Sequence, residues 1–205
     1  MNYKTLATKT SIDKTIAGLQ SKNIEAIFVE NSASAFEKIK ELIPAGASVM
    51  NGASKTLEQI GFVEYLKSAK HPWHNLHANI LAETDKTKQG ELRRQSVLSD
   101  YYLGSVHGLA ETGEFIIASN TGSQLPHIVF TSPNLIFVVG AQKIVPTLPD
   151  AFKRLEEHVI PLEDESMRAK YDVGTFPSKI VVFKRENPFV GRKVRMILVR
   201  ESLGF

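Results

Sequence analysis

The chain has 205 residues, of which 42% are hydrophobic and 23% are charged, a balance typical of a folded protein rather than a disordered one. It contains no cysteine, which excludes disulfide bonds, cysteine nucleophiles and metal or iron–sulfur sites built on thiolates of this chain. The net charge of +3 is too small to indicate nucleic acid unless the basic residues gather on one face, so we expect no nucleic-acid partner. A small anionic ligand is at least as compatible with this charge.

Apolar stretches are short throughout the chain. The run Leu135–Val139 is among the longest, whereas a membrane-spanning helix needs about 20 apolar residues. The sequence after Met1 is polar and charged, and it lacks the apolar segment of a signal peptide. We therefore expect a cytoplasmic protein with no membrane partner.

Helices and strands alternate over the first 70 residues. Apolar residues recur there at helical spacing in three segments, the first of which opens with Thr10 and Asp13 at capping-box spacing. Two short apolar runs lie between these segments, and the first of them is expected to be a buried strand. The predicted elements are helices over 10–22, 34–43 and 54–70 and strands over 24–29 and 47–50. This order favours an α/β fold with a mainly parallel sheet flanked by helices.

The rest of the chain continues the same pattern less regularly. Residues 71–90 are expected to be loop or short helix, and the apolar strand 135–140 is expected to be central in the sheet. The remaining predicted elements are a helix over 89–103, a hairpin of strands 106–110 and 114–119, a helix opening at Thr147, and strands 180–183 and 194–199. Because no linker divides the chain, we predict one domain over residues 1–205, with residues 1–22 as an N-terminal helical arm.

An acidic turn joins the two strands of the predicted hairpin. Glu111 stands there two residues before Gly113, which allows close backbone approach. A carboxylate at a strand end can act as a general base or a nucleophile, and His107 on the same strand is a candidate acid–base partner. The alternatives are that Glu111 lies in a solvated turn and that His107 is a strand-edge histidine with no functional role.

Two polar turns are candidate anion sites. Asn120, Thr121, Gly122 and Ser123 form a loop whose backbone N–H groups and hydroxyls can hold a carboxylate or phosphate. An ordinary loop has the same composition, so this alternative stays open.

The second turn follows the strand 47–50. Asn51 and Gly52 lie in it, Ser54 begins the next helix, and Lys55 adds a positive charge, so we expect these four residues to make a second anion contact. A plain helix cap at Ser54 is the alternative. No phosphate-binding loop or dinucleotide-binding glycine motif is present.

Three histidines fall within seven residues, at His71, His74 and His77. On a helix, residues spaced three apart do not stay on one face over two such intervals, so the outer two histidines would not point to one site. No flanking carboxylate completes a ligand set. We therefore predict no metal site, and we expect a surface turn there.

Several short segments together resemble the LUD-domain family, the family of the C-type lactate-utilisation proteins. They are spread in order over residues 10–205 and are more specific as a set than singly. These segments are Met50–Leu57, Arg93–Arg94 through Asp100–Tyr102, Ala110–Glu114, Val139–Pro146, and Ile197–Val199 through Leu203–Phe205.

The resemblance implies a fold similar to the superfamily of ribose-5-phosphate isomerase, glucosamine-6-phosphate deaminase and the CoA transferases. In CoA transferases of that superfamily a glutamate two residues before a glycine is the nucleophile, and Glu111 with Gly113 is similar in pattern. Members of the family linked to lactate oxidation work beside iron–sulfur subunits. We therefore expect no cofactor in this chain, with any iron–sulfur clusters on partner subunits.

Three functions remain open from the sequence. The first is an accessory subunit that binds a small anionic metabolite in the oxidation of lactate to pyruvate. The second is a free-standing isomerase or transferase acting on a sugar phosphate or CoA ester, with Glu111 as base or nucleophile. The third is a ligand sensor without catalysis. The apolar end at Phe205 is compatible with a homo-oligomer.

Overall fold

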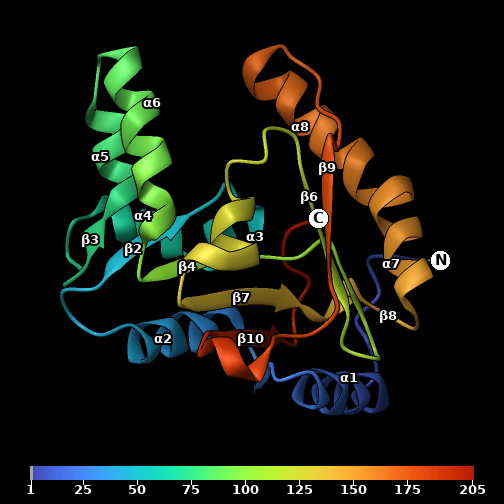
Figure 1. The fold of residues 1–205 in the computed structure, drawn as a ribbon. Coiled ribbons are helices and arrows are strands. Elements are labelled where there is room, and N and C mark those ends of the chain that lie inside the picture. The colour runs from blue at the N-terminus through green and yellow to red at the C-terminus, as the bar shows by residue number, and fades with distance from the viewer. Residues whose placement is uncertain (1) are drawn as a thin grey trace.

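The structure is a computed structural model that describes residues 2–205, and it contains two β-sheets and the helices around them (Figure 1). The larger sheet has six strands in the order β1-β10-β7-β4-β2-β3, and every neighbouring pair is parallel. Its strands are β1 (Glu25–Val29), β2 (Ser48–Asn51), β3 (His74–Asn75), β4 (Tyr101–Gly104), β7 (Asn134–Gly140) and β10 (Lys193–Val199). The predicted α/β fold with a mainly parallel sheet is therefore confirmed.

The smaller sheet has four strands in the order β8-β5-β6-β9. Its strands are β5 (Gly108–Ala110), β6 (Phe115–Ser119), β8 (Ile144–Val145) and β9 (Lys179–Phe183). β5 and β6 pair antiparallel, which confirms the predicted hairpin, and β5 pairs parallel with β8. Since β5 and β6 run in opposite directions, the start of β5 and the end of β6 lie at one edge of this sheet, and the turn at residues 111–114 lies at the other.

β7 is central in the larger sheet, as its apolar sequence predicts. Leu135, Phe137 and Val139 pack into the core on one face, and Ile136 and Val138 pack into the core on the other. This alternation follows from the two-residue repeat of a strand. Because both faces of the sheet are covered, the strand is apolar at each of these positions.

The helices complete a layered arrangement. Residues of α2, α3 and α4 cover one face of the larger sheet, whereas α1 and the smaller sheet cover the other, and α7 packs on the far side of the smaller sheet. The helices are α1 (Lys9–Ser21), α2 (Ser32–Leu42), α3 (Lys55–Gln59), α4 (Phe62–Lys67), α5 (Leu76–Ala82), α6 (Lys86–Gln95), α7 (Leu148–Arg154) and α8 (Ile160–Tyr171). Within residues 2–205, no helix has the length and apolarity needed to cross a bilayer.

Two predicted helices differ from the observed ones. The helix expected over 54–70 is divided into α3 and α4, because Gly61 adopts φ +81° between them, a conformation that interrupts a right-handed helix. The helix expected over 89–103 ends at Gln95, and Tyr101 begins the buried strand β4. The Asp100 carboxylate accepts hydrogen bonds from the backbone N and the Oγ of Ser48, which ties the start of β4 to β2.

Two further expectations near the N-terminus are also corrected. The cap of α1 is Thr8, whose Oγ1 accepts from the backbone N of Ser11, rather than the predicted Thr10. β1 is an edge strand paired only with β10, and none of its residues is fully buried. An apolar strand at the sheet edge keeps one side open, so its apolarity does not by itself predict burial.

α1 and the hairpin turn meet through two glycines. A side chain at Gly113 would place its Cβ 2.5 Å from the carbonyl carbon of Gly18, and Gly113 has φ +92°. We predict that Gly113→Ala lowers the free energy of unfolding by about 2–4 kcal/mol, through both overpacking and backbone strain. Urea unfolding measures this loss.

Gly46→Ala is the matched control, because Gly46 has φ +79° with nothing within 4 Å of the added Cβ. It should lose only about 1 kcal/mol, from the backbone conformation alone. Equal losses for the two variants would contradict the close contact between α1 and the turn.

Candidate functional site

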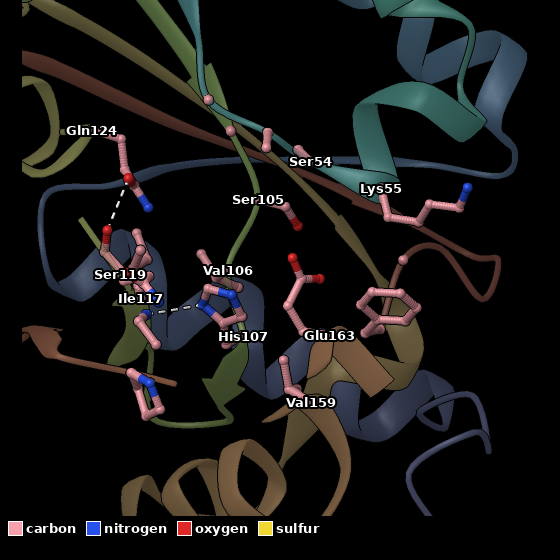
Figure 2. A pocket seen from close by; sticks show the side chains of 18 of the residues that line it. Ser54, Lys55, Ser105, Val106, His107, Ile117, Ser119, Gln124, Val159 and Glu163 are labelled. Atoms are coloured by element: carbon pink, nitrogen blue, oxygen red, sulfur yellow. Dashed lines mark hydrogen bonds between the residues drawn. The ribbon is translucent and has the colours of Figure 1, made fainter. Parts of the chain in front are cut away.

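A cavity of about 320 Å³ opens beside the carboxyl ends of β2 and β4, and it also reaches the start of β5, the end of β6 and helix α8 (Figure 2). In open parallel sheets, ligands bind at the carboxyl ends of the strands, because the chain leaves the sheet there in loops that can present polar groups. The hairpin β5–β6 adds a second wall, since the start of β5 and the end of β6 face the carboxyl ends of β2 and β4. The cavity is therefore the best-formed candidate site among the described residues.

Lys143 lies in the wall of this cavity, three residues after the end of β7. Its side chain is buried, and its Nζ donates hydrogen bonds to Thr56 Oγ1 at 3.0 Å and to Ser105 Oγ at 3.1 Å. Within residues 2–205, no carboxylate oxygen lies close enough to Nζ to form an ion pair. Burial, together with the charge of Arg154, lowers the pKa of Lys143 to about 7.

His107 lines the cavity at the start of the hairpin. Its Nδ1 accepts a hydrogen bond from the backbone N of Ala118 at 3.0 Å, so the neutral ring carries its proton on Nε2 (Figure 2). Burial and the neighbouring charges of Lys143 and Arg154 lower the pKa of His107 to about 3. At neutral pH this side chain is therefore a neutral hydrogen-bond donor rather than a cation.

Arg154 supplies a fixed positive charge behind the cavity. It is fully buried at the end of α7, and its Nη1 donates to the backbone oxygen of His107. Its Nε and Nη2 are buried and have no hydrogen-bond partner within residues 2–205. Burial lowers the pKa of Arg154 to about 10, so the guanidinium keeps its charge at neutral pH.

Glu163 is the one acidic residue among the described residues that line the cavity. It projects from α8, and its carboxylate faces the hydroxyl of Ser105 (Figure 2). Burial and the nearby charge of Glu58 raise the pKa of Glu163, although Lys170 opposes this shift. A raised pKa favours the protonated form of a carboxyl group, which is the form that acts as a general acid.

The structure brings most of the predicted site residues to this cavity. Those that line it are Gly52, Ser54, Lys55, His107, Asn120, Thr121 and Ser123. Asn51 instead lines a neighbouring cavity of about 160 Å³, where its Oδ1 lies 3.4 Å from Nδ1 of His77. Gly122 does not line the cavity, but it forms the turn of the loop, with φ +84° and its N–H donated to Ser119 Oγ. The two polar turns expected to bind anions are therefore close together.

Glu111 is not brought to the cavity. Its carboxylate accepts a hydrogen bond from Ser11 Oγ at 2.6 Å and lies 3.4 Å from Nζ of Lys14, both on α1. The reason is the direction of β5, whose start faces the cavity and whose end faces α1. The acidic turn and the Thr121 loop therefore lie at opposite ends of the hairpin, and the structure separates Glu111 from His107.

Sequence reasoning missed Lys143, Ser105 and Glu163 as site residues. A usable signal existed for Lys143, which closely follows the most apolar strand of the chain, where an α/β sheet presents its ligand-binding groups. Glu163 and Ser105 gave no comparable signal. The first lies on a long, largely exposed helix, and the second lies in a segment whose strand was predicted to be a helix.

The three clustered histidines do not converge. His71 contacts the Leu66 carbonyl oxygen and stacks on Trp73, His74 is exposed on β3, and His77 lines the smaller cavity. Over residues 2–205, no group of three or more histidine, aspartate or glutamate side chains is arranged to hold a metal ion.

Comparisons with known proteins agree with this fold. A family model described as the LUD domain matches residues 12–183. The chain is also similar to the crystal structure of a DUF162 family protein from Deinococcus radiodurans, with a TM-score of 0.52 and 11% identity over 95% of this chain and 98% of that chain. At that identity the likeness shows the fold alone. No curated protein matches the chain.

Lys143 should make stability depend on pH. An unfolded lysine keeps its proton up to about 10.5, whereas the folded group releases it at about 7. Between these values the unfolded state binds more protons, so the free energy of unfolding should rise with pH, by at most about 1.4 kcal/mol per unit. Urea unfolding across this range measures the slope.

Lys143→Met should flatten that slope, because the variant has no proton to release at this position. Lys153→Met, which changes an exposed lysine on α7, is the matched control and should keep the wild-type slope. The same slope in all three proteins would show that Lys143 is not desolvated as described.

Proposed function

This chain belongs to the LUD-domain family, and from that premise we propose that it binds a small anionic metabolite in the cavity beside Lys143. We further propose that it acts in this way as an accessory subunit in the oxidation of lactate to pyruvate. The observation that carries the proposal is a buried ammonium group without an anionic partner among residues 2–205.

The electrostatics of the cavity favour an anion. Burying a charge without an oppositely charged partner is costly. The hydroxyls of Thr56 and Ser105, which accept hydrogen bonds from Lys143, stabilise the charge only in part. Arg154 adds a second buried cation nearby, with two of its nitrogens unsatisfied. A carboxylate or phosphate in the cavity supplies the opposite charge, so its binding offsets the free-energy cost of burying these cations.

The hydrogen-bond donors of the cavity fit the same class of ligand. His107 presents Nε2–H, and the loop residues Thr121 and Ser123 add hydroxyl groups beside it. A neutral donor binds an anion without adding a further charge to be desolvated.

The size of the cavity limits the ligand to a small molecule. Ligand pockets commonly hold about 300–1,000 Å³, and the volume here, about 320 Å³, is at the lower end. Hydrophobic side chains such as Ile117, Val159 and Phe205 line part of it. These proportions suit a metabolite of a few carbon atoms with one anionic group.

The family and the composition support the accessory role. The chain has no cysteine with which to hold an iron–sulfur cluster, so electrons released from lactate would pass to partner subunits that carry such clusters. This chain would then contribute substrate or product binding.

We predict that lactate and pyruvate stabilise the protein in a thermal-shift titration. A ligand at 100 times its Kd adds about 2.7 kcal/mol of stability. Because the protonated form of Lys143 pairs with the anion, affinity for lactate should fall as pH rises through about 7.

Lys143→Met should weaken lactate binding by about 10- to 100-fold, the range expected for loss of one charge-assisted hydrogen bond. Glu111→Gln is the control and should bind as the wild type does, because Glu111 contacts α1 and not the cavity. Binding that survives in Lys143→Met but is lost in Glu111→Gln would overturn the assignment.

The accessory role has a separate test. Affinity purification of the tagged protein from its native cells should recover iron–sulfur subunits, and deletion of its gene should impair growth on lactate. Normal growth on lactate together with no such partner would reject this role and leave the ligand-binding proposal intact.

A further inference from the structure

We propose that Lys143 is a nucleophile that forms a covalent imine with the carbonyl group of a small 2-oxo acid. This inference rests on the proposed function, because it assumes that the acid enters the cavity as an anion. It goes further by assigning a chemical step to the site and by separating 2-oxo acids from 2-hydroxy acids, which have no carbonyl to react.

The surroundings of Lys143 suit a nucleophilic amine. Its two hydrogen-bond partners, Thr56 and Ser105, are neutral hydroxyls. A carboxylate partner would hold the proton on the amine, and within residues 2–205 none is in ion-pair range. The amine is also fixed in position, because a buried side chain held by two hydrogen bonds samples few rotamers.

The protonation state supports the same role. Burial and Arg154 lower the pKa of Lys143 to about 7, so a large fraction of the protein has a neutral amine at neutral pH. At an ordinary lysine pKa, only roughly one group in three thousand would be neutral there. Desolvated lysines beside another cation are activated in this way for attack on carbonyl compounds.

Glu163 is placed to move the protons that imine formation requires. Its carboxyl group faces Ser105, whose Oγ lies 3.1 Å from Nζ of Lys143 (Figure 2). Burial raises the pKa of Glu163, which favours its protonated, proton-donating form. Glu163 and Lys143 therefore line the same cavity, and they form no ion pair.

The step balances with the groups at hand. The neutral amine attacks the carbonyl carbon, a C–N bond forms, and the carbonyl electron pair moves to oxygen. One proton then passes from nitrogen to that oxygen, which gives a carbinolamine. Protonated Glu163 donates to the hydroxyl, the C–O bond breaks, and water leaves. The nitrogen keeps one hydrogen as a protonated imine, and nothing is oxidised or reduced.

The protonated imine keeps a positive charge in the cavity, opposite to the charge of the ligand's carboxylate. The protonated imine places one positive charge beside the carboxylate of the bound acid, as the ammonium does in the non-covalent complex. His107 Nε2–H can donate to that carboxylate, as can the hydroxyl of Ser123, which accepts a hydrogen bond from Thr121 Oγ1. The covalent and non-covalent complexes are therefore stabilised by the same surroundings.

The test is reductive trapping on the purified full-length chain. Pyruvate with sodium cyanoborohydride should attach one reduced pyruvate per chain, and peptide mapping by mass spectrometry should locate it on Lys143. At saturating pyruvate, trapping should become faster as pH rises through about 7, because the neutral amine attacks, whereas affinity for lactate should fall. Lactate with the same reductant should give no adduct.

Variants sharpen the result. Lys143→Met should lose the adduct, whereas Lys153→Met, which alters an exposed lysine outside the cavity, should keep it. Glu163→Gln should slow trapping by about 10²- to 10⁴-fold, as expected when a positioned general acid is removed. The peptide map of the wild-type protein decides the site even where Lys143→Met does not fold.

The outcomes separate this inference from the proposed function. No adduct, or an adduct spread over surface lysines with Lys143 unmodified, overturns the imine. If pyruvate still stabilises the protein in that case, the binding proposal stands without the covalent step. If neither lactate nor pyruvate binds and no adduct forms, both proposals fail.

Discussion

The ammonium group of Lys143 lies in the protein interior, held by two hydroxyls and without a carboxylate among residues 2–205, and the chemistry of the cavity depends on this arrangement. A buried cation in such surroundings can be stabilised by an incoming anion or can lose its proton. The first outcome supports binding of a small acid, and the second supports nucleophilic attack on one. Both proposals therefore follow from a single desolvated charge.

The architecture explains why this charge is where it is. Three parallel strands, β2, β4 and β7, end at the same edge of the larger sheet, and the residues that follow them include Thr56, Ser105 and Lys143. These groups are far apart in sequence, yet the strand order makes them neighbours. The hairpin β5–β6 adds His107 opposite them, and Arg154 behind the hairpin holds the His107 backbone.

Much of the fold was predictable from local pattern, whereas the site was predictable only in part. The central strand β7 and the hairpin were readable because apolar runs and a glycine turn are local signals. β4 was missed because Tyr101 and Tyr102 lie shortly after a helical segment, and their strand conformation depends on pairing with the distant strands β2 and β7. The Thr121 loop was predicted from its composition, but the role of Lys143 depends on burial, which arises only when distant segments pack together.

Glu111 shows that a short sequence pattern does not by itself determine the role of its residues. Its carboxylate contacts Ser11 and Lys14 and so clamps α1 against the hairpin, while Gly113 lets the helix backbone approach. In this protein, the glutamate and the glycine two positions later therefore have a structural role: they hold α1 against the hairpin. To infer a reactive carboxylate from that short pattern, one needs the direction in which its strand runs in the sheet as well as the residue types.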